Sequence, residues 1–171
     1  HAMSMPLRHL PIVQNWDCHA CSHCCRDLQV AVSEEERQRI EAQGWQDDPD
    51  IGDLPRFVRA HWWSRSYVLN HRQDRGCIFL SEENRCRIHE RFGHEAKPLA
   101  CRLYPFALVP TGDHWRVSLR YACPSAAENR GTPVKDQGKD LQQLAEEYEQ
   151  RQGLTGTLTP PPLQGRQRGD W

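Results

Sequence analysis

The stretch Cys18-His19-Ala20-Cys21-Ser22-His23-Cys24-Cys25 places four thiols within eight residues. Adjacent cysteines such as Cys24 and Cys25 point in different directions and cannot readily form a low-strain disulfide with each other. Soft thiolate ligands select zinc or iron–sulfur clusters. The sequence therefore predicts a fold organised around a metal, with all eight cysteines of the chain as candidate ligands. Four more thiols lie downstream, at Cys77, Cys86, Cys101 and Cys123.

The C-x2-C-x2-C spacing is that of bacterial ferredoxin runs, in which cysteines of one loop converge on one iron–sulfur cubane. Those runs end in a Cys-Pro pair, and Cys123 is followed here by Pro124. In two-cluster ferredoxins this last cysteine binds the other cluster, so the pair does not by itself assign Cys123. As a working hypothesis we divide the ligands into two sets, Cys18, Cys21, Cys24 and Cys123, and Cys25, Cys77, Cys86 and Cys101.

Zinc and disulfides are the alternatives to an iron–sulfur cluster. Structural zinc is typically enclosed by two separated C-x2-C pairs, whereas this chain has one dense run and scattered partners. Disulfides persist in oxidising compartments, and the segment before Cys18 lacks the apolar core of an export signal. We therefore expect a cytoplasmic protein with an iron–sulfur cluster of the [4Fe-4S] type, bound at one or more sites, with zinc as the alternative.

The 171 residues include 22 basic and 23 acidic side chains, so the chain has no overall field that would attract nucleic acid or a membrane. No segment is apolar over the length of a membrane span. We expect an unknown protein or small-molecule partner, and nothing in the chain specifies its oligomeric state. The expected organisation is an N-terminal extension over residues 1–15 with a cloning scar, a cysteine-cluster domain over 16–153, and a Pro/Gly-rich tail over 154–171.

Two helices are expected in the first half of the chain. Ser33 and Glu36 form a capping-box pattern that predicts a short helix ending near Gly44. Apolar residues recur at three and four between residues 53 and 70, which predicts an amphipathic helix. Trp62 and Trp63 would then belong to the core over the metal site.

Two β-hairpins and a further helix are expected in the second half. Residues 77–80 and 86–89 flank a polar turn and predict a hairpin that presents two thiols. Residues 106–109 and 115–121 predict a second hairpin, whose return strand leads to Cys123. Leu141, Leu144, Ala145 and Tyr148 share one face of a helix over 136–152. The expected fold class is thus α+β, a small metal-organised domain with short helices and two β-hairpins around a cysteine cluster.

Two groups of charged residues stand apart from this pattern. The aspartates at positions 47, 48, 50 and 53 miss the spacing of a calcium loop, and we interpret them as a solvated loop with a helix N-cap. Arg102 is singled out because it adjoins Cys101 and could compensate an anionic cluster.

Five motifs together resemble a known family. They are C-x2-C-x2-C-C, Cys77-Ile-Phe-Leu, Cys86-x-Ile-His, the run from Lys97 to Phe106, and Cys123-Pro124. Eight cysteines in this order, over about residues 16–126, resemble the CxxCxxCC cysteine-cluster family of YkgJ-like zinc- or iron-chelating domains. The family is distantly similar to the flagellin lysine methylase, in which an iron–sulfur cluster is implicated in methyl transfer.

The resemblance implies a cluster or metal site and leaves the reaction open. We expect an iron–sulfur protein used in redox or group-transfer chemistry, either an oxidoreductase or a component of methyl transfer if it is an enzyme. The alternatives are a zinc module that folds a partner-binding surface and a metal-handling protein. Family members often carry glycine in the first cysteine loop, whereas this chain has His19 and His23 there as additional donors.

Overall fold

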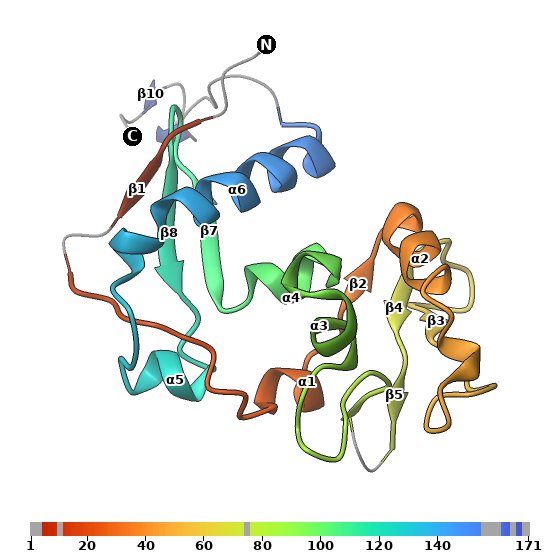
Figure 1. Cartoon of the computed structure of the whole chain (residues 1–171). Helices are drawn as coiled ribbons and strands as arrows, with labels where there is room; N and C mark the ends of the chain where they lie inside the picture. Colours follow the sequence, from red (N-terminus) through yellow and green to blue (C-terminus); the bar gives the residue numbers. More distant parts are fainter. Residues whose placement is uncertain (1–4, 10–11, 74–75, 155–161, 165–166, 169–171) are drawn as a thin grey trace. The chain divides into compact units, whose positions relative to one another are not determined.

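The computed structural model describes residues 5–9, 12–73, 76–154, 162–164 and 167–168 (Figure 1). The chain divides into two compact units, which are described separately. The terminal unit is formed by His1–Cys18 with Leu103–Trp171, and the central unit by His19–Arg102. Both combine helices with small sheets, so the α+β class is confirmed. None of the described helices is long and apolar enough to cross a bilayer.

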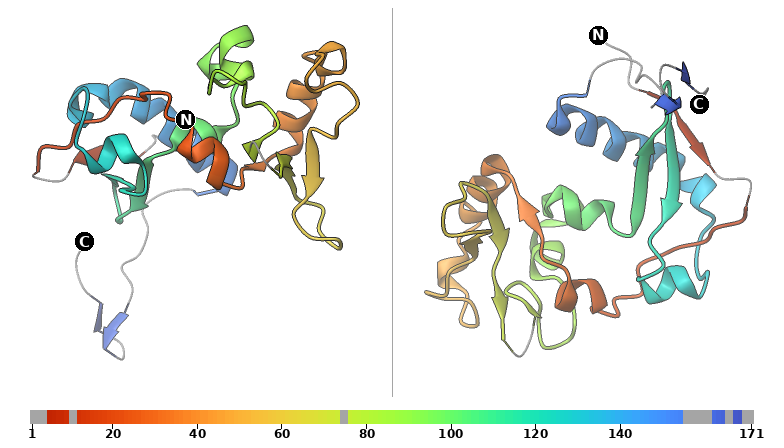
Figure 2. Two further views of the ribbon diagram at one scale, coloured as in Figure 1. Left: turned by 90° about the horizontal axis from the view of Figure 1, so that it is seen from below. Right: turned by 180° about the vertical axis from the view of Figure 1, so that it is seen from behind.

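The terminal unit is built on a three-stranded sheet in the order β1-β8-β7. Strand β1 (Leu7–His9) runs parallel to β8 (Trp115–Leu119), and β8 pairs antiparallel with β7 (Phe106–Pro110), as the second predicted hairpin requires. Helix α6 (Gly138–Gln152) packs beside this sheet (Figures 1 and 2). The contact is apolar, because Trp115 and Ala145 are fully buried in one cluster. The predicted C-terminal helix is therefore confirmed.

Short elements complete the terminal unit. Helix α5 (Pro124–Ala127) begins directly after Cys123, and the turn η3 (Val134–Gln137) leads into α6. The segment expected to form a Pro/Gly-rich tail contains the antiparallel strands β9 (Pro162–Gln164) and β10 (Gln167–Arg168). The cloning scar predicted over residues 1–3 lies outside the described residues.

The central unit contains a second antiparallel sheet, in the order β2-β4-β3. Its strands are β2 (Ala31–Val32), β3 (Phe57–Arg59) and β4 (Tyr67–Leu69). Helix α2 (Glu34–Glu41) follows β2 and starts with the predicted capping box. The Ser33 Oγ accepts the Glu36 N–H at 3.2 Å, and the Glu36 carboxylate accepts the Ser33 N–H at 2.8 Å.

The helix predicted between residues 53 and 70 is wrong, because β3 and β4 form a hairpin there. Phe57 pairs with Leu69 across the hairpin, so apolar residues at near-helical spacing meet through strand pairing instead. Trp62 and Trp63 lie in the connecting turn and are 84% and 67% exposed. They are therefore not part of the core over the metal site.

The first predicted hairpin is correct only in its turn. Leu80 and Cys86 form an isolated antiparallel bridge, but helix α3 (Arg87–Phe92) replaces the second strand. Cys77 instead ends strand β6 (Gly76–Cys77), which pairs with β5 (His71–Arg72). The remaining elements of the central unit are α1 (His23–Asp27), η1 (Trp45–Asp47), η2 (His94–Ala96) and the start of α4 (Leu99–Leu103).

Candidate metal centre

Five thiols gather in the central unit. Cys77 is buried in its hydrophobic core, and Cys25, Cys86 and Cys101 pack against the same core. The Sγ atom of Cys24 lies 4.0 Å from that of Cys25. All eight cysteines of the chain are free thiols. The five thiols come from four separate segments of the chain, so only the fold brings them together.

Helix α1 carries Cys24 and Cys25 and is tied to the turn between Cys77 and Cys86. The guanidinium of Arg26 donates to the side-chain oxygens of Ser22 at 3.1 Å and Asn84 at 2.6 Å. The Ser22 hydroxyl also lies 3.3 Å from the Asn84 amide oxygen. These hydrogen bonds hold the cysteine loop beside the segment that separates the next two thiols.

Gly76 allows strand β6 to approach helix α1 closely. Its φ angle is +85°, and a Cβ at this position would lie 2.7 Å from both the Arg26 Cα and the Cys25 carbonyl oxygen. A side chain would therefore clash with the backbone. Because Cys77 follows this glycine, the close approach places its thiol near that of Cys25.

The last two thiols belong to short helices. Cys86 is the N-cap residue of α3, and Cys101 lies in α4. The N–H of Leu99 in α4 donates to the buried Glu36 carboxylate at 2.7 Å, so the capping glutamate of α2 also anchors α4. Arg102 is buried as well, with its guanidinium donating to Glu95 Oε2 and the Lys97 carbonyl oxygen, both at 3.2 Å. The role predicted for Arg102 as a counter-charge to the cluster stays a prediction.

The thiols differ in acidity. The hydrogen bond with Cys25, supported by the Lys97 ammonium, lowers the pKa of Cys24 to about 6 and raises that of Cys25. Burial raises the pKa of Cys77 to about 12, and it also raises that of Cys101. The neighbouring thiols add to both upward shifts. Within this group, Cys24 is therefore the thiol that loses its proton most readily.

The donor set fits a thiophilic metal by its chemistry. Thiolates prefer zinc and iron–sulfur clusters over magnesium or calcium, which take oxygen ligands. Two thiolates at about 2.3 Å from one tetrahedral zinc are about 3.8 Å apart, close to the 4.0 Å between Cys24 and Cys25. Within the described ranges, no group of three or more His, Cys, Asp or Glu side chains forms a ready metal site.

The two predicted ligand sets have different outcomes. The members of the second set, Cys25, Cys77, Cys86 and Cys101, all pack around one core. The first set is divided between the units, with Cys21 and Cys24 in the central unit and Cys18 and Cys123 in the terminal unit. Cys18 and Cys21 are exposed, whereas Cys123 is buried. The assignment of all eight cysteines as ligands stays a prediction.

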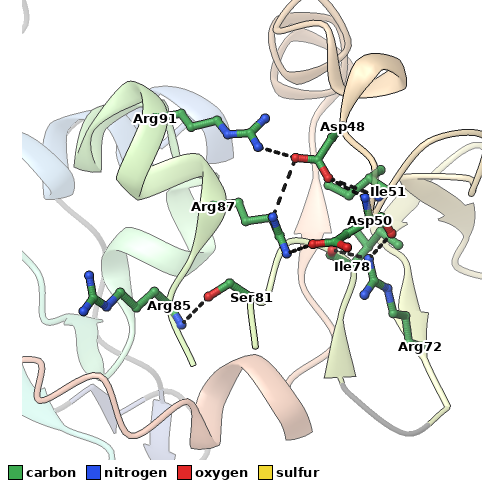
Figure 3. A network of polar contacts seen from close by, with 9 residues as sticks. All are labelled: Asp48, Asp50, Ile51, Arg72, Ile78, Ser81, Arg85, Arg87 and Arg91. Carbon is green, nitrogen blue, oxygen red and sulfur yellow. Dashed lines mark hydrogen bonds and ion pairs between the residues drawn. The ribbon is translucent and has the colours of Figure 1, made fainter. Parts of the chain in front are cut away.

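Sequence reasoning missed a buried polar network beside this region (Figure 3). Asp48, interpreted as part of a solvated loop, is 2% exposed. Its carboxylate accepts the Asp50 N–H at 2.9 Å and binds the guanidinium groups of Arg87 and Arg91 in α3. Burial by itself raises the pKa of Asp48, but the hydrogen bonds from Asp50 and Arg91 hold it below its ordinary value. The loop interpretation is wrong for this residue because local spacing carries no information on a distant arginine pair.

Comparison with known proteins yields one family and one distant relative. A family model described as "CxxCxxCC: Putative zinc- or iron-chelating domain" matches residues 17–150. The chain is 24% identical over 96 residues to the uncharacterized protein MJ0939 of Methanocaldococcus jannaschii. The match covers 55% of this chain and 30% of that relative, so the chain spans about a third of its length. No solved structure matches the chain significantly.

Proposed function

Because this chain belongs to the CxxCxxCC family of zinc- or iron-chelating domains, we propose that its central unit binds an iron–sulfur cluster used in redox or group-transfer chemistry. The observation that carries this proposal is the gathering of four thiols from four chain segments around one core, with the Cys24 sulfur 4.0 Å from that of Cys25. A cluster requires several thiolates in one place, and a cytoplasmic location would keep them reduced.

The residues that would hold the cluster are Cys24, Cys25, Cys77, Cys86 and Cys101. Five thiols exceed the four of a fully cysteine-ligated cluster, so one of them would be free or lie next to the ligands. The roles of Cys18, Cys21 and Cys123 as ligands stay predictions. When bound, a cluster supplies one-electron transfer or, with an open iron, Lewis-acid chemistry.

Zinc is the second candidate, and a specific distance favours it. The 4.0 Å between the Cys24 and Cys25 sulfurs matches two ligands of one metal ion. In that case the metal would stabilise the folded state of the central unit, and the central unit would serve as a binding module.

Anaerobic purification with elemental analysis, visible absorption and electron paramagnetic resonance separates the two candidates. For the proposed cluster we expect iron and acid-labile sulfide, sulfur-to-iron charge-transfer absorption and a paramagnetic signal in one redox state. Near-stoichiometric zinc in a colourless protein would overturn the cluster and support the zinc module. A protein that retains neither metal and binds neither on reconstitution would overturn both.

Serine variants locate the site. Cys77→Ser, Cys86→Ser and Cys101→Ser should each reduce metal content, because a hydroxyl is a poor substitute for a thiolate toward these metals. Cys18→Ser and Cys123→Ser are the matched variants in the terminal unit. Unchanged metal content in these two would limit the site to the central unit, and loss in them would place them among the ligands.

A further inference from the structure

His71 and Cys77 form a directly opposed pair in the small β5–β6 ladder. The Ile78 N–H donates to the Asn70 carbonyl oxygen at 2.8 Å, so the neighbouring pair Asn70–Ile78 is hydrogen-bonded. Antiparallel ladders alternate between hydrogen-bonded and non-hydrogen-bonded pairs. His71 and Cys77 are therefore a non-hydrogen-bonded pair, in which the two side chains project from the same face at the closest spacing.

The imidazole of His71 is partly buried. Its Nε2 atom is buried and makes no hydrogen bond within the described residues. The next residue, Arg72, projects from the opposite face, where it donates to the carbonyl oxygens of Asp50 and Ile78 (Figure 3). A buried nitrogen without a hydrogen bond is unfavourable. Such an atom needs an explanation, and its neighbour across the strand is a thiol of the proposed site.

The other histidines near the thiols differ from His71. His19 and His23 adjoin the first cysteines in sequence but are not buried, and His23 pairs with Asp27 at 3.2 Å. His19 and His23 are therefore near the thiols in the sequence, whereas the strand register places His71 opposite Cys77.

We propose that His71 Nε2 is a nitrogen ligand of the metal centre, beside Cys77; this inference rests on the proposed function. Cβ atoms of opposed residues lie about 4.5–5.5 Å apart, a spacing from which an imidazole and a thiolate can reach one metal at about 2.0–2.3 Å. The centre then has a mixed sulfur and nitrogen ligand set. In an iron–sulfur cluster, histidine in place of cysteine raises the reduction potential. In a zinc site it gives a Cys3His set.

X-ray absorption at the K edge of the metal that the purified full chain contains tests this ligand directly. Sulfur scatterers at about 2.3 Å are resolved from nitrogen at about 2.0–2.1 Å, and imidazole adds a characteristic outer-shell pattern. The wild-type protein should show both. His71→Ala should lose the nitrogen signal and at least about tenfold in metal affinity, whereas the exposed His61→Ala should retain both.

His71→Cys provides a variant with a different donor. It should keep the metal and show an all-sulfur first shell, because a thiolate replaces the imidazole. A wild-type spectrum with metal bound and sulfur alone in the first shell would overturn the His71 ligand and leave the proposed function intact. Absence of any bound metal would overturn both. The wild-type spectrum decides the question even if His71→Ala fails to fold.

Discussion

Two kinds of acid are buried in the central unit, and their environments differ. Asp48 is surrounded by donors from its own chain, two arginines and two backbone N–H groups, and its pKa is lowered. Cys77 and Cys101 have other thiols as neighbours, and burial raises their pKa. The carboxylate is thus compensated within the protein, whereas the thiolates would require a cation from outside. The comparison separates a buried acid that stays charged and paired within the chain from thiols that burial keeps protonated.

Metal removal should have the largest effect on stability, because the buried thiolates would require a cation from outside the protein. With the proposed metal bound, chelation under reducing conditions should lower the free energy of unfolding by about 5 kcal/mol or more. Denaturant titration of loaded, stripped and reconstituted protein measures this. Equal denaturation midpoints for loaded and stripped protein would contradict the dependence on metal.

Asp48→Ala should have the next largest effect, because it removes the buried carboxylate that pairs with the two arginines. It leaves Arg87 and Arg91 without this carboxylate, and loss of one partner in a buried pair costs about 3–5 kcal/mol. The matched control is Glu128→Ala, whose partner Arg130 lies 2.9 Å away with both side chains more than half exposed. That variant should cost less than about 1 kcal/mol. Similar losses in the two variants would show that the Asp48 network contributes little.

Acidification should remove part of the stabilisation that the Asp48 carboxylate provides. The pKa of Asp48 is lower in the folded protein than in the unfolded chain, where it is about 3.9. Its stabilising contribution is therefore present above pH 4 or so and is lost as the pH falls through the folded pKa. The difference in unfolding free energy between wild type and Asp48→Asn should narrow at acidic pH. A constant difference would argue against a charged Asp48.

Ser33→Ala should have the smallest effect of the four. Glu36, like Asp48, is a buried carboxylate whose partners lie in the chain, and the variant removes only the Ser33 side chain of the capping box. The Glu36 carboxylate keeps the N–H groups of residue 33 and Leu99. A loss of about 1 kcal/mol is expected in thermal or chemical denaturation. A loss above about 3 kcal/mol would show that the cap also holds α4 in place.

Elements with local signals were predicted correctly. The Ser33–Glu36 box marks the start of α2, and the apolar face of Leu141, Leu144 and Ala145 marks α6. The β7–β8 hairpin follows from alternation around a Gly-containing turn. In each case the interacting residues are close in sequence, so the pattern contains the structural information.

The segment from residue 53 to 70 shows where this approach fails. Its apolar residues fit a helical spacing, and the turn at Trp62 and Trp63 lacks the glycine, proline or asparagine that would mark it. Pairing with β2 across the sheet decides the strand conformation. Residues 86–89 show the opposite error, because they were predicted as a strand and lead into helix α3. A run this short does not distinguish a helix from a strand.

The amino-acid sequence by itself determined the family, the α+β class, the eight candidate thiols and the locally coded helices, because these depend on residue chemistry and short-range spacing. Only the tertiary structure decided that four thiols share one core with Cys24 beside them, that Asp48 is buried between arginines, and that His71 lies opposite Cys77. These relations join residues far apart in the chain or depend on strand register, and neither composition nor local periodicity specifies them.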